Sequence, residues 1–579
     1  MTTTPTTNDP SVSTAEPVRH APAPADFELD AVGLEILSNA LRSITDECFF
    51  ALMKSAYSTN IKERRDHSAS IMDVRGRLVA QSEQSLPLHI ASMSGLMESV
   101  LEKFGDDLHE GDLFVANDPY VAGGTHLPDV NLALPVFSDG TLVGFVCNIA
   151  HHADIGGMAP GSMAGGMTEI FQEGLRIPVV RLFRRGELQQ DLFDLLLLNV
   201  RVPHERRGDY FAQIAACRLG ARRLLELVEV RGAGTVTRGF ELMMERAEQR
   251  LRSAIATVPD GTYEFEDRLD SDGTDHFDLP IRVRIEVAGE RIRFDFTGTS
   301  EQVPGNMNTT LNATHASACY ALKSLLDPEI PNSQGVLDTA EVSAPPGTIL
   351  NAVFPASVAA RANTCQRIVD VIFGALAKSL PDRVPAAANG ANTTAVFAGT
   401  NPENGVPYVY LETLGGGMGA RPDRDGKDAV QVHMTNTSNL PVEAIEMEYP
   451  LLVEEYGLVP DSGGAGRRRG GLGLRRVVRP VGHDCTFNGL GERFRHEPWG
   501  LEGGGSGGRG RFAIVGDNGA ERTLGDKSGD IPIRADERVV IETPGAGGLG
   551  SPAERTPDEL DEDRRSGKFS DEYLARHYP

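Results

Sequence analysis

The earliest regular pattern along the chain is helical. Apolar residues recur at steps of three and four and form one face of a long helix: Leu34, Leu37, Leu41, Ile44, Cys48 and Leu52. The segment ASIMDVRGRLVAQ then predicts a β-hairpin that turns at Arg75-Gly76. A second helix is expected from about His89 to Phe104, where Gly105 ends the pattern.

Short apolar runs interrupted by Gly and Pro follow this helix. They cover residues 112–117, 131–137 and 141–150 and predict buried strands, whose connecting loops are common positions for functional side chains. From residue 191 to residue 257 the pattern is helical again. Strict alternation over residues 281–296 predicts a second hairpin, and helices are expected over residues 316–326 and 365–380.

The last third of the chain is rich in glycine. Beyond about Val396, segments such as SGGAGRRRGGLG and GLEGGGSGGRGRF predict tight turns between strands, and the polar end from Ser551 predicts a helical tail. A length of 579 residues exceeds what one hydrophobic core supports, so several domains are expected. The pattern predicts an α+β, multidomain, mixed α/β protein with a β-dominated C-terminal region. Its segments are a leader over residues 1–27, an α/β domain over 28–258, an α+β domain over 259–395, a glycine-rich β domain over 396–552 and a tail over 553–579.

The charge balance disfavours polyanionic partners. The 56 basic and 82 acidic residues give a net charge of −26, which excludes a general affinity for nucleic acid or an anionic membrane surface. The N-terminus, rich in Thr, Pro and Ala, predicts a disordered leader and not a signal peptide, and no apolar run is long enough to span a bilayer. Six scattered cysteines without a CxxC motif fit reduced thiols. These features together predict a cytoplasmic protein.

One stretch concentrates potential metal ligands. The run NDPYVAGGTHLPDV…NIAHHADIGG places His126, Asp129, His151, His152 and Asp154 among glycine-rich turns beside predicted buried strands. Imidazole and carboxylate together suit Zn, Mn or Fe. Adjacent side chains on an extended backbone point to opposite faces, so we expect His151 to be the inward ligand and His152 to take a supporting role.

The same residues also have a plainer interpretation, as polar side chains of surface loops. Spacing alone leaves the two interpretations open. A further ligand could come from NIKERRDHSASIMD, which holds Glu63, Asp66 and His67, although by itself that segment is typical of a solvated helix end. It contributes to a site only if the fold brings it to His126.

Nucleotide motifs are missing from the sequence. There is no GxxxxGK[ST], and the glycine runs lack the strand-to-helix setting, with an acid about 20 residues on, that a dinucleotide site needs. A GxSxG match around Ser506 lies within the run GGGSGGRG, without the preceding strand that a nucleophile elbow requires. We therefore expect no ATP or NAD site, and no catalytic serine, on this chain.

Several blocks of the sequence together resemble the hydantoinase B/oxoprolinase family. Besides the NDPY…GGTHLPDV…HHADIGG run, these are ERRDHSASIMD, LPLHIASM, DFTGTSEQVPGNMN, YALKSLLDPEIPNSQG, QRIVDVIFGALAKSLPDRVPAA, YPLLVEEYGLVPDSGGAGRRRGGLG and PWGLEGG. They span nearly everything from Phe27 onward. A mild departure is HIASM at residues 89–93, where many members read HLGSM.

The resemblance implies an enzyme subunit that binds a divalent metal and works with a hydantoinase A-type partner, an actin-like ATPase that binds ATP. It maps the metal ligands onto Asp66, His126, Asp129 and His151. It also implies similarity to the metal-binding subunits of acetone carboxylase and of ATP-dependent lactamases. The metal would then lie in the N-terminal domain and the nucleotide on a different chain of a hetero-oligomer.

The implied reaction is ATP-dependent ring opening of a cyclic amide such as a hydantoin, 5-oxoproline or a related lactam. The partner would activate the substrate carbonyl, the metal would activate water, and His152 or Asp154 would act as general base or orient a ligand. The runner-up is a subunit of an ATP-dependent ketone carboxylase of the acetone or acetophenone type. A non-catalytic scaffold that docks the ATPase and a metal-dependent hydrolase that acts alone are further alternatives.

Overall fold

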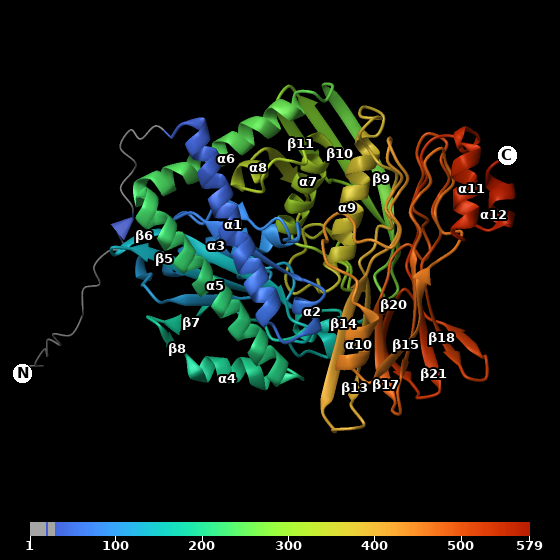
Figure 1. Ribbon diagram of the computed structural model, residues 1–579, viewed down its shortest axis with the longest axis horizontal. Helices are drawn as coiled ribbons and strands as arrows, with labels where there is room; N and C mark the ends of the chain where they lie inside the picture. Colours follow the sequence, from blue (N-terminus) through green and yellow to red (C-terminus); the bar gives the residue numbers. More distant parts are fainter. Residues whose placement is uncertain (1–18, 21–28) are drawn as a thin grey trace, which may run out of the picture.

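The computed structural model describes residues 19–20 and 29–579 (Figure 1). The leader expected over residues 1–27 lies outside the described residues, apart from β1 (Arg19–His20), which pairs with Thr141 and Leu142. The mixed helix-and-sheet, multidomain class expected from the pattern is confirmed. Four sheets carry the fold, and the described helices pack on and between them.

The N-terminal region is built on an eight-stranded sheet. Its order is β3-β2-β6-β5-β4-β7-β8, and β1 pairs with β6 off this path. The strands are β2 (His67–Met72), β3 (Leu78–Gln81), β4 (Leu113–Ala116), β5 (Asp129–Ser138), β6 (Thr141–His151), β7 (Val180–Arg184) and β8 (Glu187–Leu188). The hairpin expected around Arg75-Gly76 is the β2–β3 pair.

Helices cover both faces of this sheet, which explains why its central strands read as continuous apolar runs. Val146 on β6 packs with one face's helices, α1 (Ala31–Ser55), α5 (Pro203–Arg231) and α6 (Ala233–Ile255). Its neighbours Phe145 and Cys147 point to the opposite face, where α3 (His89–Phe104) packs. The shorter helices α2 (Thr59–Lys62) and α4 (Gln190–Leu198) flank the sheet.

The middle region holds a second sheet, ordered β12-β11-β10-β9. Its strands are β9 (Gly261–Ser271), β10 (Phe277–Ala288), β11 (Arg291–Asp295) and β12 (Ala340–Ser343), and its helices are α7 (Leu311–Leu326), α8 (Gln334–Leu337) and α9 (Arg361–Leu376). The expected hairpin and both expected helices are confirmed. All residues of α9 except Gly374 are buried, and Figure 1 shows this helix, in yellow, beside β9.

Two antiparallel sheets share one core in the C-terminal region. One contains β13 (Thr393–Thr400), β14 (Pro407–Leu414), β17 (Cys485–Leu490) and β20 (Lys527–Ile533). The other contains β15 (Leu451–Leu458), β16 (Leu474–Pro480), β18 (Arg511–Gly516), β19 (Glu521–Thr523) and β21 (Glu537–Glu542). The remaining helices are α10 (Val442–Glu448), α11 (Pro557–Arg565) and α12 (Asp571–His577), of which the last two form the expected tail.

The glycine-rich segments of this region are not simply turns between strands, as the sequence suggested. They lie against one another backbone to backbone, with Gly470 N–H donating to the Gly464 carbonyl and Gly464 N–H donating to Ala546. A Cβ on Gly470 would lie 1.9 Å from the carbonyl oxygen of Ala546. Glycine is needed there because the facing backbones leave no room for a side chain.

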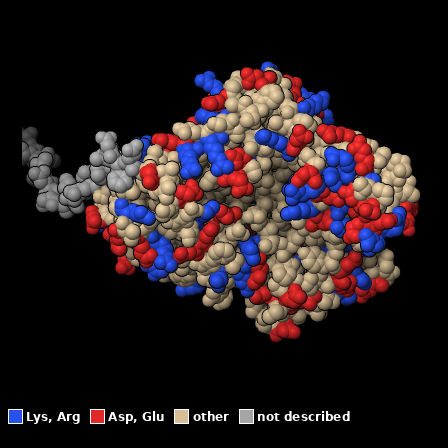
Figure 2. All heavy atoms as spheres, turned by 45° about the horizontal axis from the view of Figure 1, so that its top comes forward, with Lys and Arg blue, Asp and Glu red and all other residues tan. Residues whose placement is uncertain are grey.

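The surface carries both signs of charge. On the face shown in Figure 2, Lys and Arg are interspersed with Asp and Glu, and no broad basic surface stands out. Within residues 19–20 and 29–579, none of the helices combines the length and the apolar character needed to cross a membrane.

A glycine pair fixes how α3 approaches the loop that precedes β5. A Cβ on Gly95 of α3 would lie 2.5 Å from the carbonyl oxygen of Gly123, and Gly123 itself has a φ of +68°. Both contacts involve backbone, which cannot rotate away as a side chain can. The packing of α3 against the loop that leads to His126 therefore requires glycine at both positions.

Gly95→Ala is expected to lower the free energy of unfolding by about 3 kcal/mol or more, because the helix and the loop must separate to admit the methyl group. Urea unfolding followed by circular dichroism measures the change. Gly105→Ala is the matched control, since a Cβ there meets nothing within 4 Å. Equal unfolding midpoints for the two variants would contradict this account of the packing.

Candidate metal centre

The β5–β6 pair brings two of the candidate ligands together. Asp129 is the first residue of β5 and His151 the last residue of β6, and the antiparallel register places them directly opposite each other. His126 lies on the turn just before β5, where its carbonyl accepts a hydrogen bond from the Asp129 amide. Ligand atoms of all three side chains lie within 4.8 Å of one another, and all three residues are buried. The expected inward position of His151 follows from this register.

His126 is held in the orientation that a metal ligand needs. Its Nδ1 donates to the carbonyl of Ala359 at 3.0 Å, which assigns the proton to Nδ1 and leaves the lone pair on Nε2. That Nε2 lies 3.1 Å from Oδ1 of Asp129, yet the two make no well-oriented hydrogen bond and neither has another partner among the described residues. Two buried polar atoms that face each other unsatisfied are what a ligand pair lacking its cation would show.

Arg361 secures the other oxygen of Asp129. This first residue of α9 forms a buried ion pair with Oδ2 of Asp129, and its Nε donates to the Thr125 hydroxyl at 2.9 Å. The guanidinium therefore fixes the carboxylate plane while Oδ1 remains directed at His126. Burial alone would raise the pKa of Asp129, but His126 and Arg361 hold it well below its ordinary value.

Asp66 lies at the edge of the same centre. Its Oδ2 is ion-paired with Arg64, and its Oδ1 lies 3.6 Å from Nε2 of His89. The same His89 nitrogen is 3.7 Å from Oδ1 of Asp129, so one imidazole lies between the two carboxylates. Asp66 is thus next to the group of three, although it is not one of the three whose ligand atoms are most tightly gathered.

His89 is a site residue that the sequence reasoning did not identify. The sequence placed it at the start of a helix, which is correct, but gave no sign that its ring turns toward Asp66 and Asp129. Its Nδ1 is 2.9 Å from the Ser68 hydroxyl, which lies on β2. The one available signal was its place in the LPLHIASM block that resembles the family.

The histidines of the centre are neutral when metal-free at physiological pH. Burial lowers the pKa of His89 and His126, and it lowers that of His151 well below the ordinary value. Neutral imidazole is the form that binds a metal ion. Each carboxylate pairs with one arginine, so the centre already balances its own charge and can remain buried.

His152 and Asp154 make contacts directed at the surrounding loops. Nε2 of His152 lies 2.9 Å from the Gln213 side-chain oxygen, and its ring packs on Tyr210 with centroids 4.7 Å apart. The Asp154 carboxylate accepts from the amides of Gly156, Gly161 and Arg201 and pairs with the Arg201 guanidinium at 2.9 Å. Both therefore stiffen the HHADIGG segment that follows His151.

Glu173 supports the backbone that orients His126. Its Oε1 accepts from the Ser357 hydroxyl at 2.6 Å and from the amides of Val358 and Ala359 at 2.5 and 2.9 Å. The Ala359 carbonyl is the acceptor for His126, so this buried carboxyl holds the acceptor in place. Burial raises the pKa of Glu173 from 4.5 to about 7, and the three donors oppose that rise. The sequence reasoning missed Glu173 as well.

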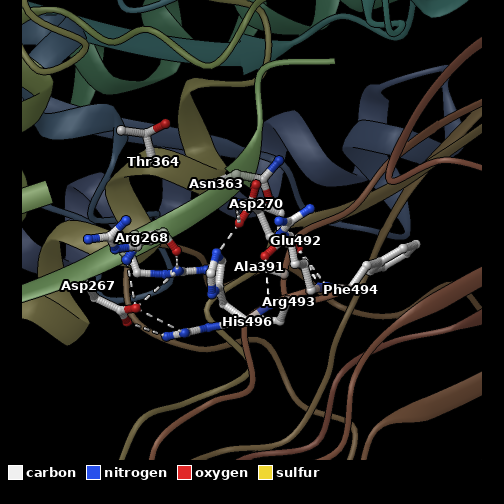
Figure 3. A network of polar contacts seen from close by, with 12 residues as sticks. Asp267, Arg268, Asp270, Asn363, Thr364, Ala391, Glu492, Arg493, Phe494 and His496 are labelled. Carbon is white, nitrogen blue, oxygen red and sulfur yellow. Dashed lines mark hydrogen bonds and ion pairs between the residues drawn. The ribbon is translucent and has the colours of Figure 1, made fainter. Parts of the chain in front are cut away.

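A second group of acids, Asp270, Glu492 and Asp526, has its charges met by the protein itself (Figure 3). Lys527 donates to Glu492 at 2.5 Å and to Asp526 at 2.8 Å, and Arg367 donates to Glu492 at 3.1 Å. Asp270 accepts from the amides of residues 494–496. An ammonium group already lies among these carboxylates, so we assign them a structural role.

Glu173→Gln tests how this support depends on pH. Glu173 titrates near pH 7 when folded and near 4.5 when unfolded, so the unfolded chain loses its proton first. Wild-type stability should therefore fall, relative to Glu173→Gln, by about 3 kcal/mol as pH rises from 4.5 to 7, and level off above that. Urea unfolding across this range measures the difference. Glu229→Gln, an exposed site, is the control, and parallel curves for wild type and Glu173→Gln would refute the buried carboxyl.

Relatives of the chain carry related names. One relative from Pseudomonas sp., assigned by inference as the B component of a D-/L-hydantoinase, is 33% identical over 95% of this chain and 95% of that protein. The 5-oxoprolinase 1 of Arabidopsis thaliana is 34% identical over 93% of this chain, which spans 43% of that longer protein. In structure, the ATP-dependent caprolactamase from Pseudomonas jessenii matches with a TM-score of 0.90 and 28% identity, over 95% of this chain and 96% of that one.

The family model of hydantoinase B/oxoprolinase matches residues 30–552. This match covers the sheet that holds the candidate metal centre, the middle region that supplies Arg361 and the two C-terminal sheets. The resemblance noted in the sequence is thereby confirmed over most of the chain. The chain belongs to the hydantoinase B/oxoprolinase family.

Proposed function

We propose that this chain is the metal-binding catalytic subunit of an ATP-dependent cyclic-amide hydrolase, with Asp66, His126, Asp129 and His151 as the metal ligands. The observation that carries the proposal is the pair of unsatisfied buried atoms, Nε2 of His126 and Oδ1 of Asp129, opposite His151. Two imidazoles and two carboxylates suit Zn, Mn or Fe. The names of the family's hydantoinase, oxoprolinase and caprolactamase members support the substrate class.

The arginines leave each carboxylate one oxygen for a cation. Arg361 binds Oδ2 of Asp129 and Arg64 binds Oδ2 of Asp66, so both Oδ1 atoms face the His89 ring. A divalent ion bound there would supply Lewis-acid activation of water or of a carbonyl group. His89, between the two Oδ1 atoms, is placed to donate a hydrogen bond to a substrate oxygen or to accept a proton from water.

His152 and Asp154 are proposed to act mainly by holding His151 in position. The sequence allowed a general base or an orienting role for them, and their contacts with Gln213 and Arg201 favour the orienting role. The buried His152 imidazole is neutral near pH 7, since burial lowers its pKa to about 4. A group so fixed would keep the strand end rigid while His151 binds the ion.

The energy source is proposed to lie on another polypeptide. Amides are poor electrophiles, and coupling to ATP would activate the carbonyl before water attacks. One relative is named as a single component of a hydantoinase, and this chain spans less than half of the 5-oxoprolinase it matches. Both facts support a hydantoinase A-type, actin-like ATPase partner in a hetero-oligomer. ATP would be bound by that partner, and the complex would work in the cytoplasm on a small cyclic amide.

A ketone carboxylase remains the competing hypothesis and is separated by one reagent. A carboxylase requires added bicarbonate for turnover, whereas ring opening requires only water. The assay with the partner subunit and ATP is therefore run with and without bicarbonate, on a hydantoin, 5-oxoproline, caprolactam and acetone. Bicarbonate-dependent consumption of the ketone, with no lactam opened, would replace the hydrolase proposal with the carboxylase.

His126→Ala is expected to lose at least about tenfold in metal affinity and most lactam turnover, because one nitrogen ligand disappears from the centre. Elemental analysis of the purified chain and ATP-dependent lactam hydrolysis with the partner measure the two effects. His204→Ala is the control, because that imidazole is exposed on α5. Unchanged metal content and unchanged turnover in His126→Ala would reject both the metal centre and its role.

A further inference from the structure

A cavity of about 510 Å³ lies where the three regions of the chain meet. Its lining comes from the segment before and at the start of α3, from α7 and α8, and from residues 418–436 of the C-terminal region. A volume of this size suits a small organic ligand, and junctions between domains are common places for such sites. One wall is apolar and includes Ile90, Cys319, Val336 and Leu337.

The charged groups of the cavity favour an anion. Lys323 and Lys427 both line it, whereas the acidic residue on its wall, Glu83, is already paired with Arg42 at 2.7 Å. The Lys323 ammonium donates to the side-chain oxygen of Asn332 at 2.8 Å. No carboxylate within the described part of the chain forms an ion pair with it. This is unusual for a protein with a net charge of −26.

The Lys323 side chain is poorly solvated. Burial lowers its pKa to about 8, and the carboxylates of Glu329 and Asp327 only partly oppose that shift. Asp327 is itself committed to Arg250, from which both of its oxygens accept hydrogen bonds. An ammonium that has lost water without gaining a counter-ion would bind a carboxylate more strongly than an exposed lysine does.

His433 provides a second polar group at the opposite wall. Its Nε2 lies 3.1 Å from Oδ1 of Asp370, and Asp370 is in turn fixed by Arg493 at 3.0 Å. The His433 ring is edge-on to Phe373. The residue lines the cavity, so its imidazole is held at the wall by a fixed carboxylate. The ion network drawn in Figure 3, which includes Arg493, therefore also orients a cavity-lining imidazole.

The cavity is next to the metal centre but distinct from it. His89 turns its ring to Asp66 and Asp129, while the following residue, Ile90, lines the cavity. The backbone of this segment is tied to the far wall, since the Leu88 amide donates to the Met434 carbonyl. One helix start thus separates the two.

We propose that this cavity binds a small organic carboxylate, with its anionic group at Lys323 and its carbon chain along the apolar wall. A ring-opened cyclic amide is a carboxylate of this class. That link rests on the proposed function, whereas the binding itself does not. The cavity would then hold ligand within one helix turn of His89, beside the centre where the amide bond is opened.

Calorimetric titration of the full, chelator-treated chain tests the proposal, with glutarate as the probe and glutaramide as its neutral counterpart. Glutarate is expected to bind wild type at least about tenfold more tightly than glutaramide, which corresponds to one charge-assisted contact. Lys323→Met should abolish that preference and Lys323→Arg should retain most of it. Lys378→Met, which removes an exposed lysine elsewhere, should leave it unchanged.

Equal binding of glutarate and glutaramide to wild type would overturn the proposal, and so would a glutarate preference that survives in Lys323→Met. The wild-type comparison needs no variant, so it stands even if Lys323→Met fails to fold. Because neither metal, ATP nor partner is present, the result is also independent of the hydrolase assay. A failed titration with active hydrolase rejects only the cavity ligand, and the reverse outcome rejects only the reaction.

Discussion

The buried ion pair between Arg361 and Asp129 is the contact on which the candidate metal centre depends. Both residues are almost fully buried, and they belong to different regions of the chain. Loss of the guanidinium would leave a carboxylate alone in the interior, at a cost of about 3–5 kcal/mol. The pair also has a directional effect, because it occupies Oδ2 and leaves Oδ1 facing His126. The stretch that ends at Arg361 places the Ala359 carbonyl against the same histidine.

Helix α9 connects this centre to the rest of the molecule. Its first residue reaches Asp129, whereas Arg367 and Asp370 further along bind Glu492 and Arg493 of the C-terminal region. A helix buried on nearly every side can carry so many polar residues only because each finds a charged or hydrogen-bonding partner. The three regions therefore share one polar framework, with the metal centre and the anion cavity close to its ends.

Local pattern predicted the parts of the site that are local in sequence. The strands that present Asp129 and His151 read as apolar runs, α3 was placed at its observed bounds, and residues 126–151 showed their ligand types directly. His89, Glu173 and Arg361 were missed. Arg361 lies 232 residues from Asp129, and no periodicity or spacing reports a contact across such a distance. The choice of Asp66 came from family resemblance, since its segment alone resembled a solvated helix end.

The glycine-rich C-terminal region shows a different limit. A glycine signals either a turn or a close backbone approach, and the sequence cannot distinguish the two when glycines occur in clusters. Here Gly464 and Gly470 serve close approach, in stacked segments where any side chain would collide. The β-rich character was therefore predicted correctly, whereas the layering of these segments required the three-dimensional structure.

Anomalous diffraction from crystals grown with Mn²⁺ tests the central claim most directly, because it locates the ion without relying on activity. The account predicts one strong peak between His126, Asp129 and His151, within bonding distance of Asp66 or of a water held by it. It predicts none at Asp270, Glu492 and Asp526, where Lys527 already supplies the positive charge. A peak at the second group, or no peak at the first, would contradict it.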